Sequence, residues 1–390
     1  MHSSIKTRSD KPRIAIIVPK YGLVGGGERF AFEVTERMAC EGRYEFHVFA
    51  NRWQAAESSP VIFHKVPTAS FPRFLRAFVF PWFARRMTNQ GNFNVIHSHE
   101  RVFSADIISL HGFPHAEWTR DVRQKSPSLF DRGVAFVERR MTQNSLARYF
   151  LPVSSIAMEA YRRTYTTLPG RWQVMHPGVD VARFSSPNRD ACRARIRERY
   201  GIGVSDVLVL FVGMNFEVKG LDTLIAAVAK ARAAKPEANV RLLVVGRGDE
   251  RKYTRIAKSM GISEAVVFAG TQSEGIEHYY RAADLFAMLS AFDTFGMVVL
   301  EAMAAGLPVV ISANVGAKDL VEEGLNGFIL PDHRNADATA CKIVHLLDHE
   351  QRETMGRAAS QSASMHGWSN LVCTLNALYE EVLQQKTYRQ

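Results

Sequence analysis

The sequence predicts an α/β protein built from two doubly wound, Rossmann-like domains. The first observation is that short apolar segments alternate with longer segments of helical period, and the chain runs through this series twice. The second is that the apolar segments lack polar alternation, which is typical of parallel strands covered on both faces. A length of 390 residues agrees with two domains.

The first series begins with the strand signal RIAIIV at 13–18, a glycine-rich turn and a helix predicted at 28–41. The second begins with VLVLFV at 207–212, a loop and a helix predicted at 221–235. The other predicted strands are 45–50, 61–66, 93–97 and 107–111 in the first series, and 240–245, 266–269, 285–289 and 308–311 in the second.

The order of predicted strands and helices divides the chain into two domains and a C-terminal helical segment. The stretch SSPN at 185–188 interrupts the pattern, so we place the N-terminal domain at 1–185 and the C-terminal domain at 186–367. Leu371, Leu375, Leu378 and Val382 have helical spacing after Gly367, and this helix within 368–390 can pack back on the N-terminal domain.

Charge distinguishes the two halves. The formal net charge is +10, and the first 185 residues carry 26 Lys and Arg against 15 Asp and Glu, whereas the rest carry 23 against 24. The basic surplus therefore lies in the first half, where it favours an anionic partner such as a membrane or a phosphorylated acceptor. Nucleic acid fits less well, because no helix-turn-helix, finger or RNP signature is present.

No segment approaches the roughly 20 apolar residues that span a bilayer, and Met1–Lys11 lacks the apolar core of a secretory signal. The four cysteines are far apart and lack the paired spacing of a zinc or redox site. We therefore expect a cytoplasmic protein with reduced thiols.

The strongest candidate site is the segment DTFGMVVLEAMAAGLPVV, which starts at Asp293. Glu301 lies among apolar neighbours, so its carboxylate either is paired internally or accepts hydrogen bonds from ligand hydroxyls. A helix predicted to begin near Phe295 and Gly296 leaves the amides from Phe295 through Met297 to Val298 free to bind an anion. Hydroxyl and phosphate recognition together indicate a nucleotide sugar.

A second candidate is VGMNFEVKGLD at 212–222, where Gly213 ends a buried strand and Lys219 precedes the next helix. Lys219 is either a solvated side chain or a point charge for a diphosphate. The spacing of a Walker loop is absent.

A third candidate is the run Gly25–Gly27 after the first strand, in which Gly26 and Gly27 permit close ligand approach or only a tight turn. Positions 30 and 31 hold Phe and Ala where a dinucleotide fingerprint needs Gly, which argues against NAD.

The histidines at 97, 99, 111 and 115 form a fourth group. A metal site lacks the accompanying acidic ligands, so we expect none. His111 ends a predicted strand, where open α/β sheets bind ligands, so it either contacts a ligand or is a structural histidine.

Together these motifs resemble the GT-B glycosyltransferases of family 4. The matching segments include GGGERF at 25–30, HSHE at 97–100, HPGVD at 176–180, VGRGD at 245–249 and NGFILP at 326–331. The resemblance implies two Rossmann-like domains with an interdomain cleft, retention of anomeric configuration, and no metal or cofactor. The nucleotide sugar is the donor substrate.

By motif, Glu301 would bind the ribose hydroxyls and Lys219 the diphosphate. Asp293 would contact the donor sugar, His111 would lie near its reacting end, and Gly26 and Gly27 would approach it across the cleft. Two residues depart from the family pattern: Asp293 replaces a Glu, and Met214 replaces an Arg after Gly213.

The motif VGMNFEVKGLD is similar to that of enzymes that add the first glucose to the heptose region of lipopolysaccharide core. This predicts transfer of glucose from UDP-glucose to a lipid-linked glycan. The alternatives are a family-4 transferase for an exopolysaccharide, a phosphoinositide or a small molecule, and a nucleotide-sugar epimerase of the same architecture.

The segment FPRFLRAFVFPWFARR at 71–86 carries four Arg, six aromatic residues and no acid. It is either a buried helix with a basic edge or a surface for anionic lipid headgroups. We therefore also expect peripheral docking of the N-terminal domain on the inner leaflet.

Overall fold

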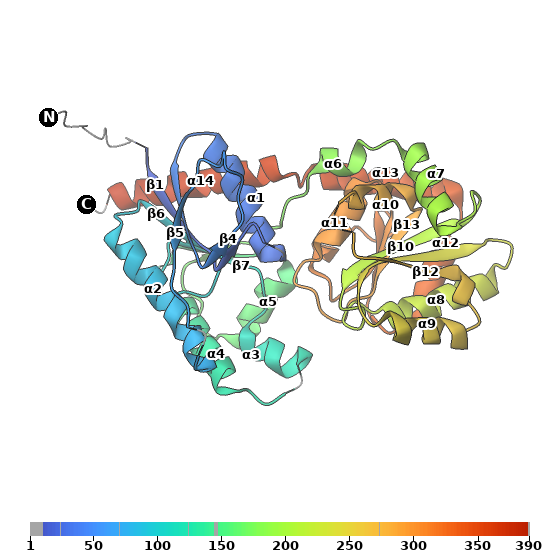
Figure 1. Cartoon of the computed structure of the whole chain (residues 1–390), viewed down its shortest axis with the longest axis horizontal. Coiled ribbons are helices and arrows are strands. Elements are labelled where there is room, and N and C mark those ends of the chain that lie inside the picture. The colour runs from blue at the N-terminus through green and yellow to red at the C-terminus, as the bar shows by residue number, and fades with distance from the viewer. Residues whose placement is uncertain are drawn as a thin grey trace. The chain divides into compact units, whose positions relative to one another are not determined.

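The computed structural model describes residues 11–23, 25–69, 71–123, 125–143, 147–272 and 274–388. The chain divides into two compact units. Unit 1 comprises Met1–Pro177 and Trp368–Gln390, and unit 2 comprises Gly178–Gly367. Each unit contains a parallel sheet with helices on both faces (Figure 1), which is the arrangement that the apolar strands predict.

Unit 1 contains a seven-stranded parallel sheet in the order β5-β3-β1-β6-β7-β8-β9. Its strands are β1 (Arg13–Ile17), β3 (Glu45–Ala50), β5 (Ile62–Lys65), β6 (Val95–Ser98), β7 (Ile107–Leu110), β8 (Tyr149–Pro152) and β9 (Arg171–Trp172). A separate two-stranded ladder joins β2 (Lys20–Tyr21) to β4 (Arg52–Trp53). The helices are α1 (Gly26–Cys40), α2 (Arg76–Gln90), α3 (His115–Glu117), α4 (Leu129–Thr142), α5 (Ser155–Thr164) and α14 (Trp368–Thr387), with a 3-10 turn at Arg73–Leu75 and a π turn at Trp118–Val122.

Unit 2 contains a six-stranded parallel sheet in the order β12-β11-β10-β13-β14-β15. Its strands are β10 (Val207–Met214), β11 (Val240–Arg247), β12 (Val266–Gly270), β13 (Leu285–Met288), β14 (Val309–Ser312) and β15 (Gly327–Leu330). Its helices are α6 (Val181–Ser185), α7 (Arg189–Tyr200), α8 (Leu221–Ala234), α9 (Glu250–Ser259), α10 (Ile276–Ala282), α11 (Met297–Ala304), α12 (Ala336–His345) and α13 (His349–Ser364), with 3-10 turns at Ser263–Ala265 and Gly316–Leu320.

Both sheets have the strand order 3-2-1-4-5-6 of dinucleotide-binding folds, apart from the short edge strand β9 in unit 1. In such sheets the strand order reverses between the first and fourth strands, and ligands bind beyond their carboxyl ends. The reversal lies between β1 and β6 in unit 1 and between β10 and β13 in unit 2. Lys219 and Asp293 follow β10 and β13, the two strands at the reversal of the second sheet. His111 follows β7, which is the neighbour of β6 in the first sheet.

The boundary between the units differs from the sequence prediction. It lies between Pro177 and Gly178, not between residues 185 and 186. The reason is helix α6, which packs on α10 and α11 of unit 2. Phe184 is fully buried there with its ring 5.4 Å from that of Tyr280, and Arg183 pairs with Glu277.

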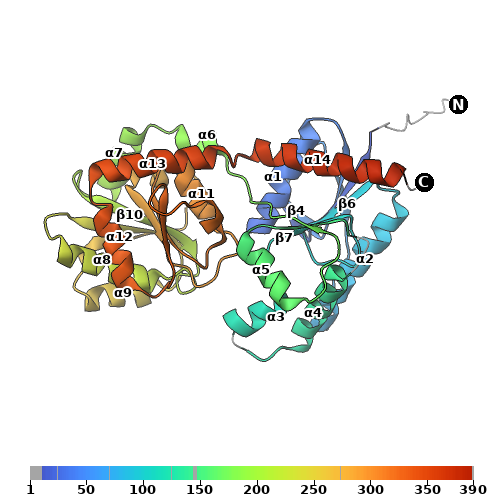
Figure 2. The same ribbon diagram turned by 180° about the vertical axis from the view of Figure 1, so that it is seen from behind.

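Helix α14 belongs to unit 1 although it follows unit 2 in the chain. It packs on α1 and β6, and Figure 2 shows it along the back of the unit. Its Tyr379 hydroxyl lies 2.8 Å from Nδ1 of His97, and the Asn376 amide donates to Glu41 at 2.9 Å. Buried polar contacts therefore fix α14 at a defined register against the sheet.

Candidate functional site

The glycine run of unit 1 starts a helix where the sequence predicts a turn. Helix α1 begins at Gly26, two residues earlier than expected, with Gly25 as its N-cap at a φ of 153°. A Cβ on Gly26 would meet nothing within 4 Å, whereas a Cβ on Gly27 would lie 2.9 Å from Cγ of His111. Gly26 therefore leaves open backbone, and Gly27 makes room for the His111 ring.

The four histidines separate into three environments. His99 and His111 follow the neighbouring strands β6 and β7, and Nδ1 of His99 lies 3.0 Å from Nε2 of His111. His97 lies between Tyr379 and the Ser109 hydroxyl, which is 2.9 Å from its Nε2. His115 instead contacts Asp131 at 3.0 Å. Among the described residues, no group of three or more His, Cys, Asp or Glu side chains is placed to hold a metal ion.

Burial keeps the imidazoles at the sheet edge neutral. It lowers the pKa of His97 to about 3 and that of His111 to about 4, and it lowers the pKa of His99 well below the ordinary value. These side chains therefore act as neutral hydrogen-bonding groups near pH 7.

A cleft of about 950 Å³ opens beside His111, and unit 1 alone lines it. Lys20, Arg52 and Arg76 reach it from β2, β4 and α2, and none of the three forms an ion pair with another described residue. Two acids, Glu28 and Glu100, also line it. No local pattern in the sequence marks these three cations as a site, because they lie on elements far apart in the chain.

Arg101 lines the same cleft but is already paired. Its Nε donates to Glu138 at 2.5 Å, and its Nη2 donates to the carbonyl of Phe113 at 3.2 Å. Glu138 is fully buried and also accepts from the Tyr165 hydroxyl at 2.7 Å. Arg101 therefore holds the loop after β7 in place, and the unpaired cations remain available to a ligand.

The loop after β10 carries the first candidates of unit 2. Gly220 has a φ of 70°, and a Cβ there would lie 2.1 Å from the carbonyl oxygen of Leu289. The start of α8 therefore lies directly against the end of β13. Gly213 packs against the aliphatic part of Lys219, which a Cβ would approach to 3.2 Å.

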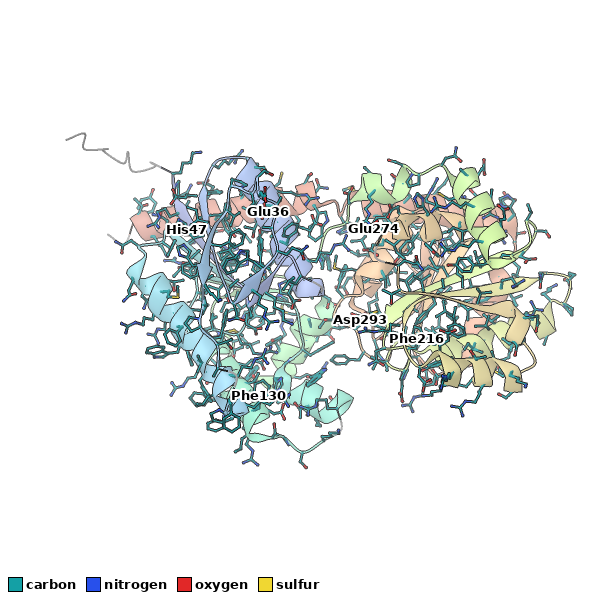
Figure 3. The ribbon with its side chains drawn as sticks, in the orientation of Figure 1. Glu36, His47, Phe130, Phe216, Glu274 and Asp293 are labelled. Carbon is teal, nitrogen blue, oxygen red and sulfur yellow. The ribbon has the colours of Figure 1, made fainter. Side chains whose placement is uncertain are left out.

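Lys219 forms an ion pair with Asp293, and both side chains are mostly buried. Asp293, labelled in Figure 3, also accepts a hydrogen bond from the amide of Phe295 at 3.3 Å. The two candidates that the sequence assigns to diphosphate and sugar are therefore in direct contact, and Lys219 is not the solvated side chain of the alternative.

Helix α11 begins at Met297 after Gly296, which has a φ of 85° and supplies no side-chain cap. The first helical amides, those of Met297 and Val298, have no intrahelical acceptor. The expectation of a free amide at Phe295 is wrong, because Asp293 occupies it. The anion-binding end of the helix is thus one residue shorter than predicted.

Glu301 lies one turn into α11 and is 7% exposed. Its Oε2 accepts a hydrogen bond from the Tyr280 hydroxyl at 2.9 Å. One partner of this carboxylate is therefore a tyrosine of α10, and no local pattern in the sequence predicts this pairing.

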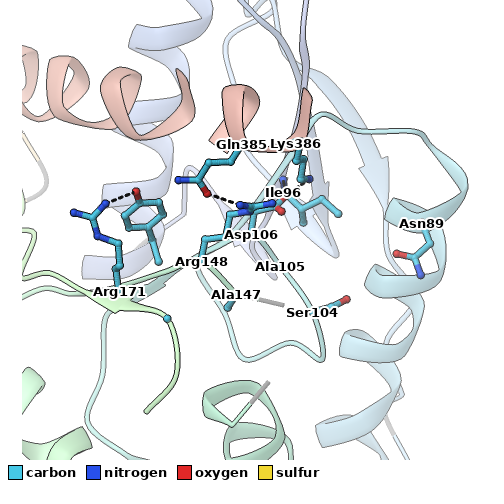
Figure 4. Close-up of a pocket in the computed structure, with 12 residues that line it drawn as sticks. Asn89, Ile96, Ser104, Ala105, Asp106, Ala147, Arg148, Arg171, Gln385 and Lys386 are labelled. Carbon is cyan, nitrogen blue, oxygen red and sulfur yellow. Dashed lines mark hydrogen bonds and ion pairs between the residues drawn. The ribbon is translucent and has the colours of Figure 1, made fainter. Parts of the chain in front are cut away.

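A second cavity of about 520 Å³ lies at the opposite edge of the first sheet, before β7 and β8 (Figure 4). Lys386 donates to Asp106 at 2.7 Å, Arg148 donates to Gln385, and Arg171 donates to Glu381 at 2.9 Å. Parallel sheets bind ligands at the carboxyl edge. These contacts instead fasten the end of α14 to the sheet.

Comparison with known proteins agrees with this division. A model described as Glycosyltransferase Family 4 matches residues 24–183, and one described as Glycosyl transferases group 1 matches residues 193–362. The chain has the GT-B glycosyltransferase fold. The first match lies in unit 1 except for residues 178–183, and the second lies wholly within unit 2.

Two curated relatives are named D-inositol 3-phosphate glycosyltransferase. The protein of Corynebacterium kroppenstedtii is 31% identical over 229 residues, which is 57% of this chain and 50% of that protein. The protein of Mycolicibacterium smegmatis is 34% identical over 220 residues, 55% of this chain and 48% of that protein. The chain spans about half the length of the curated relatives it matches.

Solved structures show the same fold over nearly the whole chain. WaaG, a glycosyltransferase involved in lipopolysaccharide biosynthesis, gives a TM-score of 0.77 at 22% identity and covers 94% of this chain and 99% of its own. HepE from Anabaena, solved with UDP and glucose, gives 0.68 at 20% identity and covers 95% and 100%. At these identities the likeness shows the GT-B fold alone.

Proposed function

We propose that this glycosyltransferase moves a sugar from a nucleoside diphosphate donor to a phosphorylated polyol. The donor we propose is a UDP-sugar. The observation that carries the acceptor class is the cleft beside His111, where Lys20, Arg52 and Arg76 have no ion pair with another described residue. Cations without partners suit a phosphate group. The relatives named for D-inositol 3-phosphate favour an inositol phosphate over the lipopolysaccharide heptose expected from the sequence.

The donor belongs to unit 2 in this proposal. Lys219 and the first amides of α11 stabilise negative charge on the diphosphate, and Glu301 accepts from the ribose hydroxyls. The bond from the anomeric carbon to the diphosphate breaks while a bond to the acceptor oxygen forms. The acceptor proton passes to the leaving phosphate, and the anomeric configuration is retained.

The donor and acceptor are tested in two steps. UDP-, GDP- and ADP-sugars are screened for thermal stabilisation, and the best donor is then assayed with inositol 3-phosphate, unphosphorylated inositol and a phosphorylated heptose glycan. We expect transfer to a phosphorylated acceptor and not to unphosphorylated inositol. Isomerisation of the donor without transfer would instead identify an epimerase, and transfer only to uncharged acceptors would exclude the phosphate site.

Substitutions of arginines that line the cleft test whether it binds the phosphorylated acceptor. Arg52→Ala and Arg76→Ala should each raise KM for the phosphorylated acceptor about tenfold and leave the donor affinity unchanged, since each removes one charge contact. Arg162→Ala is the matched control, because Arg162 is an exposed arginine on α5 that does not line the cleft. Equal effects at all three positions would contradict the assignment.

We also propose that unit 1 docks on anionic membranes through a face of α2 and α4, which pack together. Trp82 and Phe136 are 51% and 48% exposed, and Arg86 and Arg140 lie over their rings. Phe78 of α2 contacts Phe136 with ring centroids 6.1 Å apart, so the aromatic groups of both helices adjoin. Helix α2 has no acid, and the two acids of α4 are buried and paired.

Exposed aromatic rings beside arginine suit the headgroup region of an anionic bilayer. Among the described residues, no helix is long and apolar enough to cross a membrane. Sedimentation with phosphatidylglycerol vesicles at low salt tests the docking. Trp82→Ser with Phe136→Ser should abolish it, whereas Leu325→Ser, an exposed apolar residue of unit 2, should not. Binding to neutral vesicles alone would contradict the role of the arginines.

A further inference from the structure

The pair His99–His111 offers two proton arrangements, and they differ in what His111 presents to a ligand. Nδ1 of His99 and Nε2 of His111 are 3.0 Å apart, and the rings stack with an interplanar angle of 15°. Both rings are neutral, so one nitrogen of the pair carries the hydrogen and the other accepts it. Whichever nitrogen donates fixes the tautomer of both rings.

The far side of His99 decides between the arrangements. Its Nε2 is fully buried and has no hydrogen-bond partner. If His99 accepted from His111, its own hydrogen would sit on Nε2 as a buried N–H without an acceptor. If His99 donates, Nε2 carries only an unused lone pair. Buried unpaired N–H groups are rarer and costlier in native proteins than under-used acceptors.

We infer that His99 donates from Nδ1 to Nε2 of His111 and thereby fixes the His111 hydrogen on Nδ1. Nδ1 of His111 has no partner among the described residues, and the residue itself is only partly buried, whereas Nε2 of His99 is enclosed. His111 lines the cleft of unit 1. It therefore presents a single N–H donor there and no basic nitrogen.

The surroundings hold the pair in this geometry. The ring of Phe30 lies 4.9 Å from that of His111 and 5.7 Å from that of His99. Gly27 lies against the Cβ, Cγ and Cδ2 atoms of His111, all of which a Cβ on Gly27 would approach to within 3.1 Å. The amide of His99 also bonds the carbonyl of Ile17 at 2.9 Å, which ties it to β1. This close packing restricts rotation of the His111 ring about its Cβ–Cγ bond and keeps Nε2 directed at His99.

His99 is accordingly a positioning residue, and His111 is a hydrogen-bond donor to a substrate oxygen rather than a general base. This role rests on the proposed transfer reaction. The tautomer does not, because it is a property of the free protein.

The tautomer is measured directly on the unliganded full chain with ¹⁵N-labelled histidine. Two-bond and three-bond couplings to the carbon-bound ring hydrogens, together with the ¹⁵N shifts, separate protonated from unprotonated nitrogens, and His111→Asn assigns the signals of this residue. We expect a protonated Nδ1 and an unprotonated Nε2 at His111 from pH 6 to pH 8. A protonated Nε2 at His111 would overturn the inference, whatever the enzyme transfers.

Three variants of His99 then test its positioning role. The side-chain amide introduced by His99→Asn can donate from the position of Nδ1, the carboxylate introduced by His99→Asp can only accept there, and His99→Leu can do neither. We expect the protonated Nδ1 of His111 to persist only in His99→Asn, with kcat/KM within about threefold of wild type. The other two should lose about 10–100-fold.

Folding of each variant is checked by thermal melting of the full chain, followed by the tryptophan fluorescence of unit 1. If His99→Asp unfolds the protein, the comparison of His99→Asn with His99→Leu still decides between a donor and a space-filling ring. Full activity in His99→Leu would show that His99 only fills space. An active His99→Asp with an inactive His99→Asn would show that His99 accepts, and either result would overturn the assignment.

Discussion

Lys219 and Asp293 form an ion pair between the loop after β10 and the segment that leads into α11. The pair joins the two segments that flank the strand reversal of the second sheet. A cation at this position is held in place before any ligand arrives. It needs little reorganisation to meet a diphosphate, which is the condition for effective electrostatic stabilisation of a leaving group.

Lys219→Ala should lower kcat about 100-fold or more while the protein stays folded, because the charge on the leaving diphosphate loses its cation. Steady-state kinetics with the best donor and circular dichroism measure the two effects. Lys230→Ala is the control, since Lys230 on α8 forms an exposed ion pair with Asp337. Near-normal turnover in folded Lys219→Ala would refute its role.

Glu301→Gln should weaken binding of the nucleotide about tenfold, because a neutral amide is a poorer acceptor for two hydroxyls than a carboxylate. Calorimetric titration with UDP measures the effect. Tyr280→Phe removes the hydroxyl that orients Glu301 and should weaken binding in the same direction. Tyr279→Phe is its neighbour control, since that hydroxyl contacts Tyr200 instead. A loss in Tyr279→Phe equal to that in Tyr280→Phe would point to a general loss of packing.

The sequence predicts the parts of this molecule that depend on local pattern. Strands such as β1 and β10 are apolar on both faces, and helices such as α8 end at recognisable breaks. The resemblance assigns Lys219 and Asp293 to adjoining parts of one donor, and in the fold their side chains form an ion pair.

Contacts between residues far apart in the sequence cannot be predicted from local patterns. His97 bonds Tyr379, 282 positions later, and no local pattern contains that partner. The boundary prediction failed because SSPN breaks the apolar pattern although Phe184, just before it, already packs in unit 2. The cleft cations Lys20, Arg52 and Arg76 come together only in the folded unit.

Gly27→Ala should destabilise the protein by about 1–3 kcal/mol and lower activity at least tenfold, because the new methyl displaces His111. Gly26→Ala is the matched variant, since its methyl enters open space. Its stability should change by less than about 0.5 kcal/mol. If a ligand approaches the backbone there, Gly26→Ala will raise KM without changing the melting temperature. Unchanged kinetics would remove Gly26 from the site.

The buried histidines of unit 1 should make its stability depend on pH. The pKa values of His97, His99 and His111 lie below the ordinary 6.5 in the folded state, so only the unfolded state takes up these protons between pH 6.5 and about 4. The free energy of unfolding should therefore fall as the pH falls through this range, by about 1.4 kcal/mol per pH unit for each histidine.

All five tryptophans of the chain belong to unit 1, so their fluorescence during urea unfolding follows this unit alone. His99→Leu removes one of these groups and should reduce the slope of stability against pH by about 1.4 kcal/mol per pH unit. His333→Asn, in unit 2, should leave the slope of this transition unchanged. A stability of unit 1 that stays constant between pH 6.5 and 5 would show that these imidazoles take up protons in the folded state.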